Sequence, residues 1–228
     1  MALKLKVFSI IPVSFVDCRN DVCAVFFLSG CNMHCPYCQN YPHYLSGKEI
    51  TLEEIMNMLS DNWAVGAVKF TGGEPLLQGD SVIEVSKRLK REGYGIAIDT
   101  NGTKPKVVEE LCRIGLLEAA VDLKAPKKKY KDITGLDAYD KVIETIKIFK
   151  EYNVDFEVRT TIAEPLLTID DLREMASTLN KLGVKLWYFQ VYRPVSHAKG
   201  LVRPDVVKLR KLVDELKEEY AIDIKLRV

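Results

Sequence analysis

Residues 30–40 read GCNMHCPYCQN, and they place Cys31, Cys35 and Cys38 in one short loop that follows an apolar run. The spacing C-x3-C-x2-C offers three thiolates close together and no fourth. A structural metal site is usually closed by four ligands, whereas three thiolates hold a cubic iron–sulfur cluster by three of its irons and leave the last iron open. We therefore expect Cys31, Cys35 and Cys38 to bind a [4Fe-4S] cluster that does chemistry at its open corner.

A zinc site is the alternative for the same loop, with His34 or His43 as the fourth ligand, because zinc accepts mixed Cys and His ligands. Zinc sites usually divide their ligands into two separated pairs, and no second pair follows here. A zinc-stabilised binding module thus stands as the non-enzymatic alternative. The other three cysteines are expected to be buried, reduced structural residues: Cys18, Cys23 and Cys112.

The composition is that of an ordinary soluble globular domain. The chain has 228 residues, of which 47% are hydrophobic and 29% charged, enough to build one sizeable core. No apolar stretch is long enough to span a membrane, and the alternating residues 1–6 do not form a signal peptide, so we expect a cytoplasmic protein with no membrane partner. The net charge of +1 gives no reason to expect nucleic-acid binding.

Short apolar, β-branched runs alternate with helical patterns along the chain. We expect strands at 25–28, 67–70, 95–99, 119–123, 155–161 and 185–190, with further strands at 5–11 and 222–228. Between them, helices are expected from a capping box at 51–54, at 81–92, 106–113, 139–152 and 169–182, and from Pro204 onward. Strand alternating with helix requires parallel pairing through right-handed crossovers.

Six such units are too few for a closed eight-stranded barrel, which typically takes about 250 residues. An open barrel and a doubly wound sheet remain, and the residues after each strand decide between them. Each strand is followed by a polar or glycine-rich motif: the cysteine loop, 71–75 (TGGEP), 99–102 (DTNG), 122–124 (DLK), 159–161 (RTT) and 190–193 (QVYR). In a barrel these ends converge on one rim, whereas a doubly wound sheet divides them at a switch point. We predict a partial (β/α)6 TIM-like barrel in a single domain over 1–228, with its core at about 22–193 and a C-terminal helix and strand at 204–228.

With these motifs and this fold, the chain resembles the radical S-adenosylmethionine (SAM) enzymes, over about 25–193. Within that superfamily the DTNG and DLK motifs are most similar to the activating enzymes of glycyl-radical enzymes, such as those of pyruvate formate-lyase and anaerobic ribonucleotide reductase. The resemblance implies reductive cleavage of SAM at a [4Fe-4S] cluster to a 5′-deoxyadenosyl radical. That radical would abstract hydrogen from a backbone glycine of a partner enzyme, with electrons from a donor such as flavodoxin or ferredoxin.

The resemblance also implies SAM-binding roles near the cysteine loop. The segment Gly72-Gly73-Glu74 is expected to hydrogen-bond the methionine amino group, since glycine lets the backbone approach a ligand closely. Tyr37 is expected to stack near the adenine. Taken alone, these residues would be a strand-to-helix turn and a loop-packing aromatic side chain.

Oxygen ligands follow two neighbouring strands. By resemblance, Asp99, Thr100 and Asp122 would hold a monovalent cation against the methionine carboxylate, and Lys124 would reach the same carboxylate. Strand-end aspartates that merely cap loops or helices are the alternative.

Arg159 is expected at the SAM carboxylate or ribose, with an internal ion pair as its alternative. Arg193 stands where the pyruvate formate-lyase activating enzyme has a cofactor-contacting His, and Gln39 stands where the activating enzymes commonly have His. These two departures leave the substrate open, and the alternative is modification of a small molecule or nucleobase, as in 7-carboxy-7-deazaguanine synthase or a tRNA-modifying enzyme. A predicted loop at 124–131 holds five lysines beside the rim, either as solvated surface or to dock an acidic partner or a phosphate-bearing substrate.

Overall fold

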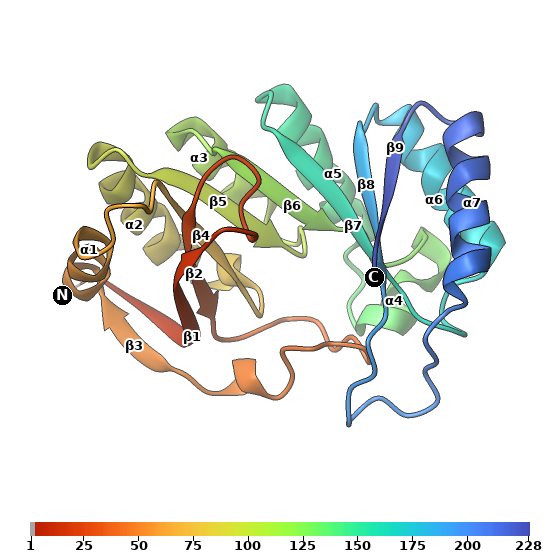
Figure 1. Ribbon diagram of the computed structural model, residues 1–228, viewed down its shortest axis with the longest axis horizontal. Helices are drawn as coiled ribbons and strands as arrows, with labels where there is room; N and C mark the ends of the chain where they lie inside the picture. The colour runs from red at the N-terminus through yellow and green to blue at the C-terminus, as the bar shows by residue number, and fades with distance from the viewer. Residues whose placement is uncertain (1–2) are drawn as a thin grey trace.

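The computed structural model describes residues 3–228, which form one nine-stranded sheet in the order β3-β1-β2-β4-β5-β6-β7-β8-β9 (Figure 1). The seven strands from β2 to β9 in this order are all parallel, while β1 runs antiparallel to both β2 and β3. The strands are β1 (Lys4–Ser14), β2 (Cys23–Leu28), β3 (Lys48–Thr51), β4 (Ala67–Gly72), β5 (Gly95–Thr100), β6 (Glu118–Asp122), β7 (Phe156–Ile162), β8 (Leu186–Val191) and β9 (Asp223–Arg227).

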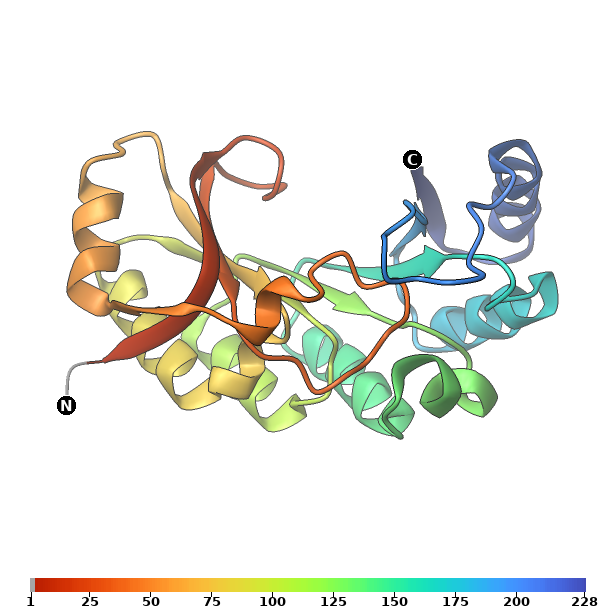
Figure 2. The ribbon, with the colours of Figure 1, turned by 90° about the horizontal axis from the view of Figure 1, so that it is seen from below.

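Helices connect the parallel strands and cover one face of the sheet, as Figure 2 shows. They are α1 (Leu52–Ser60), α2 (Gly79–Arg91), α3 (Pro105–Ile114), α4 (Lys127–Thr134), α5 (Tyr139–Glu151), α6 (Ile169–Lys181) and α7 (Val206–Glu219), with short 3-10 turns at His43–Leu45 and Pro75–Gln78. The predicted capping box is present, because the Thr51 hydroxyl accepts from the Glu54 amide while the Glu54 carboxylate accepts from the Thr51 amide.

The prediction of a partial barrel is confirmed. Within the described residues, β3 and β9 form the two edges of the sheet, which does not close on itself. Alternate residues of a strand point to opposite faces, so Val68 and Phe70 join the buried core while Lys69, between them, pairs with Asp99 on the concave face. The six predicted β/α units correspond to β2, β4, β5, β6, β7 and β8, and β9 adds one more parallel strand.

The lysine-rich segment 124–131 differs from its prediction as a loop, since most of it lies in α4. Three of its lysines form ion pairs within the protein: Lys127 with Asp140, Lys128 with Glu174 and Lys129 with Asp171. The carboxylates beside Lys127, Lys128 and Lys129 offset the repulsion among these like charges within one helical turn. The short strand β3 was not predicted either.

The expectation that all cysteines outside the motif are reduced was wrong. A disulfide joins Cys18 to Cys23, whereas Cys112 is buried and free as predicted. The spacing of the two residues in sequence gives no sign of the loop that brings them together at the start of β2. No helix among residues 3–228 is long and apolar enough to cross a membrane.

Candidate active site

A cavity of about 540 Å³ lies at the carboxyl ends of the strands, as the barrel prediction requires. Its wall combines the cysteine loop with residues from the ends of β4, β5, β6, β7, β8 and β9. The lining residues are Asp17, Cys31, Met33, Cys35, Tyr37, Cys38, Gln39, Asn40, Gly72, Gly73, Asn101, Asp122, Lys124, Thr161, Gln190, Val191, Arg193 and Arg227.

The three motif cysteines are all free thiols that face this one cavity. The Cys38 amide donates to the Cys35 carbonyl at 3.1 Å, and the Met33 amide approaches the Cys31 sulfur at 3.5 Å. Burial raises the pKa of the Cys31 thiol to about 11 and also raises the pKa of Cys35. Thiolates at this site therefore require a positive charge beside them, which bound iron supplies. The donor set fits a cluster.

The zinc alternative gains no support from the geometry. Among residues 3–228, no group of three or more His, Cys, Asp or Glu side chains converges closely enough to hold a single metal ion. A cubic cluster does not need such convergence, because each thiolate binds a different iron.

Tyr37 and Lys124 lie beside the cysteines. The Tyr37 side chain is buried and its hydroxyl has no hydrogen-bond partner among the described residues. The Lys124 ammonium donates to Asp122 at 2.9 Å. Burial lowers the pKa of Lys124, but the negative charges of Asp122 and Cys35 outweigh it and hold the pKa well above its usual value. Lys124 thus presents a fixed positive charge to the cavity, with Asp122 as its support.

Gly72 and Gly73 also line the cavity, but packing within the protein already requires them. A Cβ atom on Gly72, whose φ is +111°, would lie 2.6 Å from the Leu28 amide nitrogen, and one on Gly73 would collide with the Gly30 carbonyl. The Gly73 amide donates to Leu28 at 2.9 Å, and the Asn40 side chain donates to the Gly72 carbonyl. The backbone at Gly72 and Gly73 therefore packs directly against β2 and the cysteine loop, which only glycine allows. The same backbone also faces the cavity.

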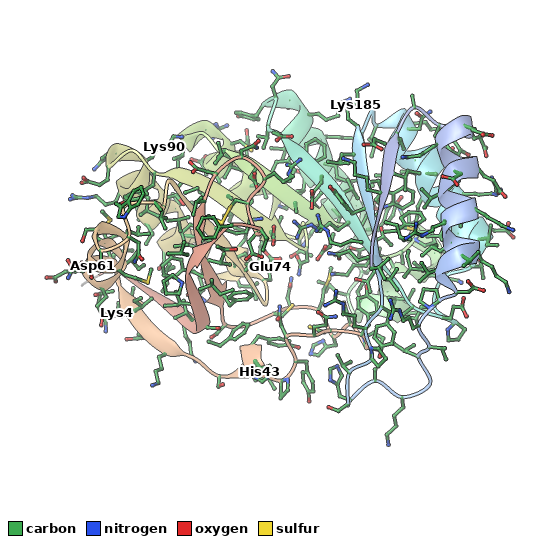
Figure 3. All side chains as sticks on the ribbon, viewed as in Figure 1. Lys4, His43, Asp61, Glu74, Lys90 and Lys185 are labelled. Carbon is green, nitrogen blue, oxygen red and sulfur yellow. A yellow bond between two sulfur atoms is a disulfide. The ribbon has the colours of Figure 1, made fainter. Side chains whose placement is uncertain are left out.

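Glu74 does not line the cavity and instead lies inside the molecule (Figure 3). Its fully buried carboxylate accepts hydrogen bonds from the Thr100 hydroxyl at 2.8 Å, the Asn101 amide at 2.6 Å and the Leu76 amide at 3.0 Å. Burial raises its pKa to about 7. The hydrogen bonds of Glu74 thus hold the end of β5 in place. Of Glu74, Thr100 and Asn101, only Asn101 lines the cavity.

Asp99 and Arg159 lie on the concave face and do not line the cavity. The Asp99 carboxylate pairs with Arg159 at 3.1 Å and with Lys69 at 3.3 Å, and Arg159 also pairs with Glu157 at 2.5 Å. Of the three oxygen ligands predicted for a cation, only Asp122 reaches the cavity. Asp99 already has two cationic partners.

Several lining residues were not predicted from the sequence. Asn40 and Asn101 stand within the quoted motifs at 30–40 and 99–102 but were given no role. Asp17, from the loop between β1 and β2, and Arg227, from β9, lie outside the predicted barrel core. Arg193 was predicted and does line the cavity, where it donates to the Val228 carbonyl at 3.1 Å. A regular strand pattern at 222–228 was the one signal for Arg227.

Comparisons with known proteins agree with the family resemblance of the sequence and with the partial barrel fold. The model of the Radical SAM superfamily matches residues 25–181. A Methanocaldococcus jannaschii protein named for glycyl-radical enzyme activation is 34% identical over 99% of this chain and 97% of its own. A Thermococcus kodakarensis protein named for GTP 3′,8-cyclase activity is 29% identical over 82% of this chain and 65% of its own. The crystal structure of Streptococcus suis SuiB bound to the precursor peptide SuiA shares the fold, with a TM-score of 0.73 at 18% identity over 90% of this chain and 48% of SuiB.

Proposed function

The chain belongs to the radical SAM superfamily, and from this premise we propose that it is an activating enzyme that generates a glycyl radical on a partner enzyme. The observation that carries the proposal is the relative named for glycyl-radical enzyme activation, which aligns over nearly the whole of both chains. The open barrel supports it too, because a polypeptide segment reaches a cavity more easily through an unclosed sheet than through a sealed one.

In this proposal Cys31, Cys35 and Cys38 hold a [4Fe-4S] cluster. When bound, the cluster supplies the electron, received from a flavodoxin or ferredoxin, that cleaves SAM to methionine and a 5′-deoxyadenosyl radical. The backbone at Gly72 and Gly73 receives the methionine amino group, and Lys124 receives its carboxylate with the help of Asp122.

Other residues of the proposed site act by position. Tyr37 packs beside the cofactor and keeps water from the reacting atoms. Glu74 fixes Asn101 at the cavity wall through the end of β5. None of these residues needs to act as a general acid or base, because the proposed step moves a hydrogen atom.

The alternative is that the radical attacks a small molecule or nucleobase. The relative named for GTP 3′,8-cyclase activity favours this alternative, although the chain spans less than two thirds of its length. In both cases the cluster and the SAM-binding residues are the same, and the two functions differ only in what enters the cavity.

The experiment compares the native protein with Cys35→Ala after anaerobic reconstitution with iron and sulfide. The native protein is expected to bind the cluster and to release 5′-deoxyadenosine from SAM after reduction. Cys35→Ala should lose cluster and product, and Cys112→Ala should keep both, because Cys112 lies on α3 and outside the cavity. Zinc in place of iron in the native protein would contradict the proposal.

A glycyl radical signal by electron paramagnetic resonance, after mixing with a glycyl-radical enzyme of the same organism, tests the choice of partner.

A further inference from the structure

We propose that Arg227, with Arg193 beside it, forms an oxyanion-binding end of the cavity that recognises a carboxylate or phosphate group of the substrate. This inference rests on the proposed function, whose substrate it describes. Both arginines line the same cavity as the three cysteines, but they come from the ends of β9 and β8, at the opposite end of the parallel strand order from β2.

The Arg227 guanidinium is held against an aromatic ring, and it shares its acidic partner with two other arginines. Its carbon lies 4.1 Å from the centre of the Tyr188 ring, and the strand register sets Arg227 directly beside Gln190. Among the described residues its one carboxylate partner within 4 Å is Glu157, at 3.6 Å. Arg159, at 2.5 Å, and Arg19, at 3.5 Å, pair with the same carboxylate, so three guanidinium groups share one negative charge. Stacking orients a guanidinium while leaving its N–H groups free to donate.

Arg193 adds a second positive charge at this place. In the part of the chain that the structure describes, Arg193 makes no ion pair with a carboxylate side chain, and its guanidinium donates at 3.1 Å to the main-chain oxygen of Val228, the last residue of the sequence and the neighbour of Arg227. By contrast, Lys124 in the same cavity is paired with Asp122. Arg227 lies on the edge strand and Arg193 follows the end of β8, and both side chains are exposed on one side. Both also line the cavity, and Arg227 is held against an aromatic ring.

The surrounding groups suit an oxyanion. Gln190 and Thr161 supply neutral hydrogen-bonding groups at the same wall. Arginine binds carboxylate and phosphate through paired N–H donors, so either oxyanion fits. Under the proposed function the oxyanion is an acidic side chain of the partner polypeptide, near the target glycine; under the alternative it is a nucleotide phosphate.

The test uses the full chain with its cluster reconstituted and SAM bound. Binding of two matched pairs of probes is measured by ligand-observed NMR: acetyl-aspartyl-glycinamide against acetyl-asparaginyl-glycinamide, and GTP against guanosine. We expect the aspartyl probe to bind about tenfold more tightly than its neutral analogue. Arg227→Gln should abolish that preference, and Arg210→Gln, an exposed arginine on α7, should retain it.

A preference confined to GTP over guanosine, and lost in Arg227→Gln, would support the oxyanion site and contradict the glycyl-radical function. Equal binding of charged and neutral probes by the native protein would overturn the inference, as would a preference that persists in Arg227→Gln. Release of 5′-deoxyadenosine by the same sample reports separately on the radical chemistry of the proposed function.

Discussion

At the scale of single residues, Glu74 links the backbone at Gly72 and Gly73, which we propose to bind SAM, to the core. It follows Gly72 and Gly73 directly, yet its carboxylate turns inward to the Thr100 hydroxyl and the Asn101 amide. A buried carboxylate is costly to ionise, and three donors offset part of that cost. Burial of the Glu74 carboxylate therefore lowers the stability of the fold, while its hydrogen bonds hold the adjoining loop in position.

The pH dependence of stability should reveal this residue. Because the folded-state pKa of Glu74 is raised from 4.5 to about 7, the folded protein holds a proton that the unfolded chain has lost. The contribution of Glu74 to the free energy of unfolding thus falls as the pH rises from 4.5 through about 7, by up to about 1.4 kcal/mol per pH unit.

Urea unfolding of the native protein and Glu74→Gln across this range measures the effect. The native protein should lose stability relative to the variant as the pH rises, because glutamine does not titrate. The exposed residue Glu53 gives the control, Glu53→Gln. Curves for the native protein and Glu74→Gln that stay parallel with pH would contradict the prediction.

At the scale of elements, α4 joins the cysteine loop to the rest of the barrel. The Thr134 carbonyl, at the end of α4, accepts from the His34 amide at 2.8 Å, in the middle of the motif. At the start of α4, Lys128 and Lys129 reach Asp171, a buried residue in the capping box of α6. The cysteine loop is thus connected through α4 to α6.

Asp171→Asn should weaken this connection. Burial raises the pKa of Asp171, but hydrogen bonds from Lys129 and Thr168 outweigh it and hold the pKa well below its usual value. The charge therefore stabilises the fold above pH 3.8, and the benefit is lost as the pH falls below that value. Replacing it should cost about 2–3 kcal/mol near neutral pH, as hydrogen bonds to a charged group do.

Urea unfolding near pH 7 checks the loss of stability, and iron retention after reconstitution checks the effect on the cysteine loop. Asp170→Asn is the matched control, since Asp170 is the exposed neighbour in the same first turn of α6. If both variants lost the same stability, the ion pairs of α4 would not be the cause.

At the scale of the whole molecule, a network of charges on the concave face joins strands far apart in sequence. Lys69 of β4 is buried and lies 3.3 Å from Asp99 of β5 and 3.5 Å from Glu118 of β6. It also donates to the Asp17 carbonyl, and Glu118 accepts from the Arg19 amide at 2.9 Å. The loop between β1 and β2, closed by the Cys18–Cys23 disulfide, is thereby held against the beginnings of β6 and β7.

Removing Lys69 should therefore affect the whole fold. In Lys69→Met the buried Glu118 carboxylate loses its cation, while Asp99 keeps Arg159; leaving Glu118 unpaired should cost about 3–5 kcal/mol in urea unfolding. Lys4→Met removes an exposed pair with Glu49 and should cost below about 1 kcal/mol. Hydrogen exchange should also increase at residues 15–22 in Lys69→Met alone; unchanged exchange there would show that the network does not hold this loop.

Much of the fold was predictable because it depends on local patterns. The apolar residues of β4 alternate, as Val68 and Phe70 do, and those of α2 recur at the period of a helix, as Val82, Val85 and Leu89 do. Such periods indicate a strand or a helix without any knowledge of tertiary contacts. The segment α4 was missed for the same reason, because its run of lysines carries little apolar periodicity. Burial of Tyr130 and Ile133, and ion pairs with Asp140, Asp171 and Glu174, accompany the helix only in the folded protein.

The sequence by itself determined the chemistry of the protein: three thiolates in one loop, and polar motifs at the ends of strands that must be parallel. Both follow from covalent spacing and hydrogen-bond geometry, which act over a few residues. Only the tertiary structure decided how the polar residues divide between the cavity and the interior. Glu74 and Asp99 turn to buried partners, Arg227 reaches the cavity from the far edge of the sheet, and Cys18 meets Cys23, because burial and charge pairing join groups whose distance the chain order does not specify.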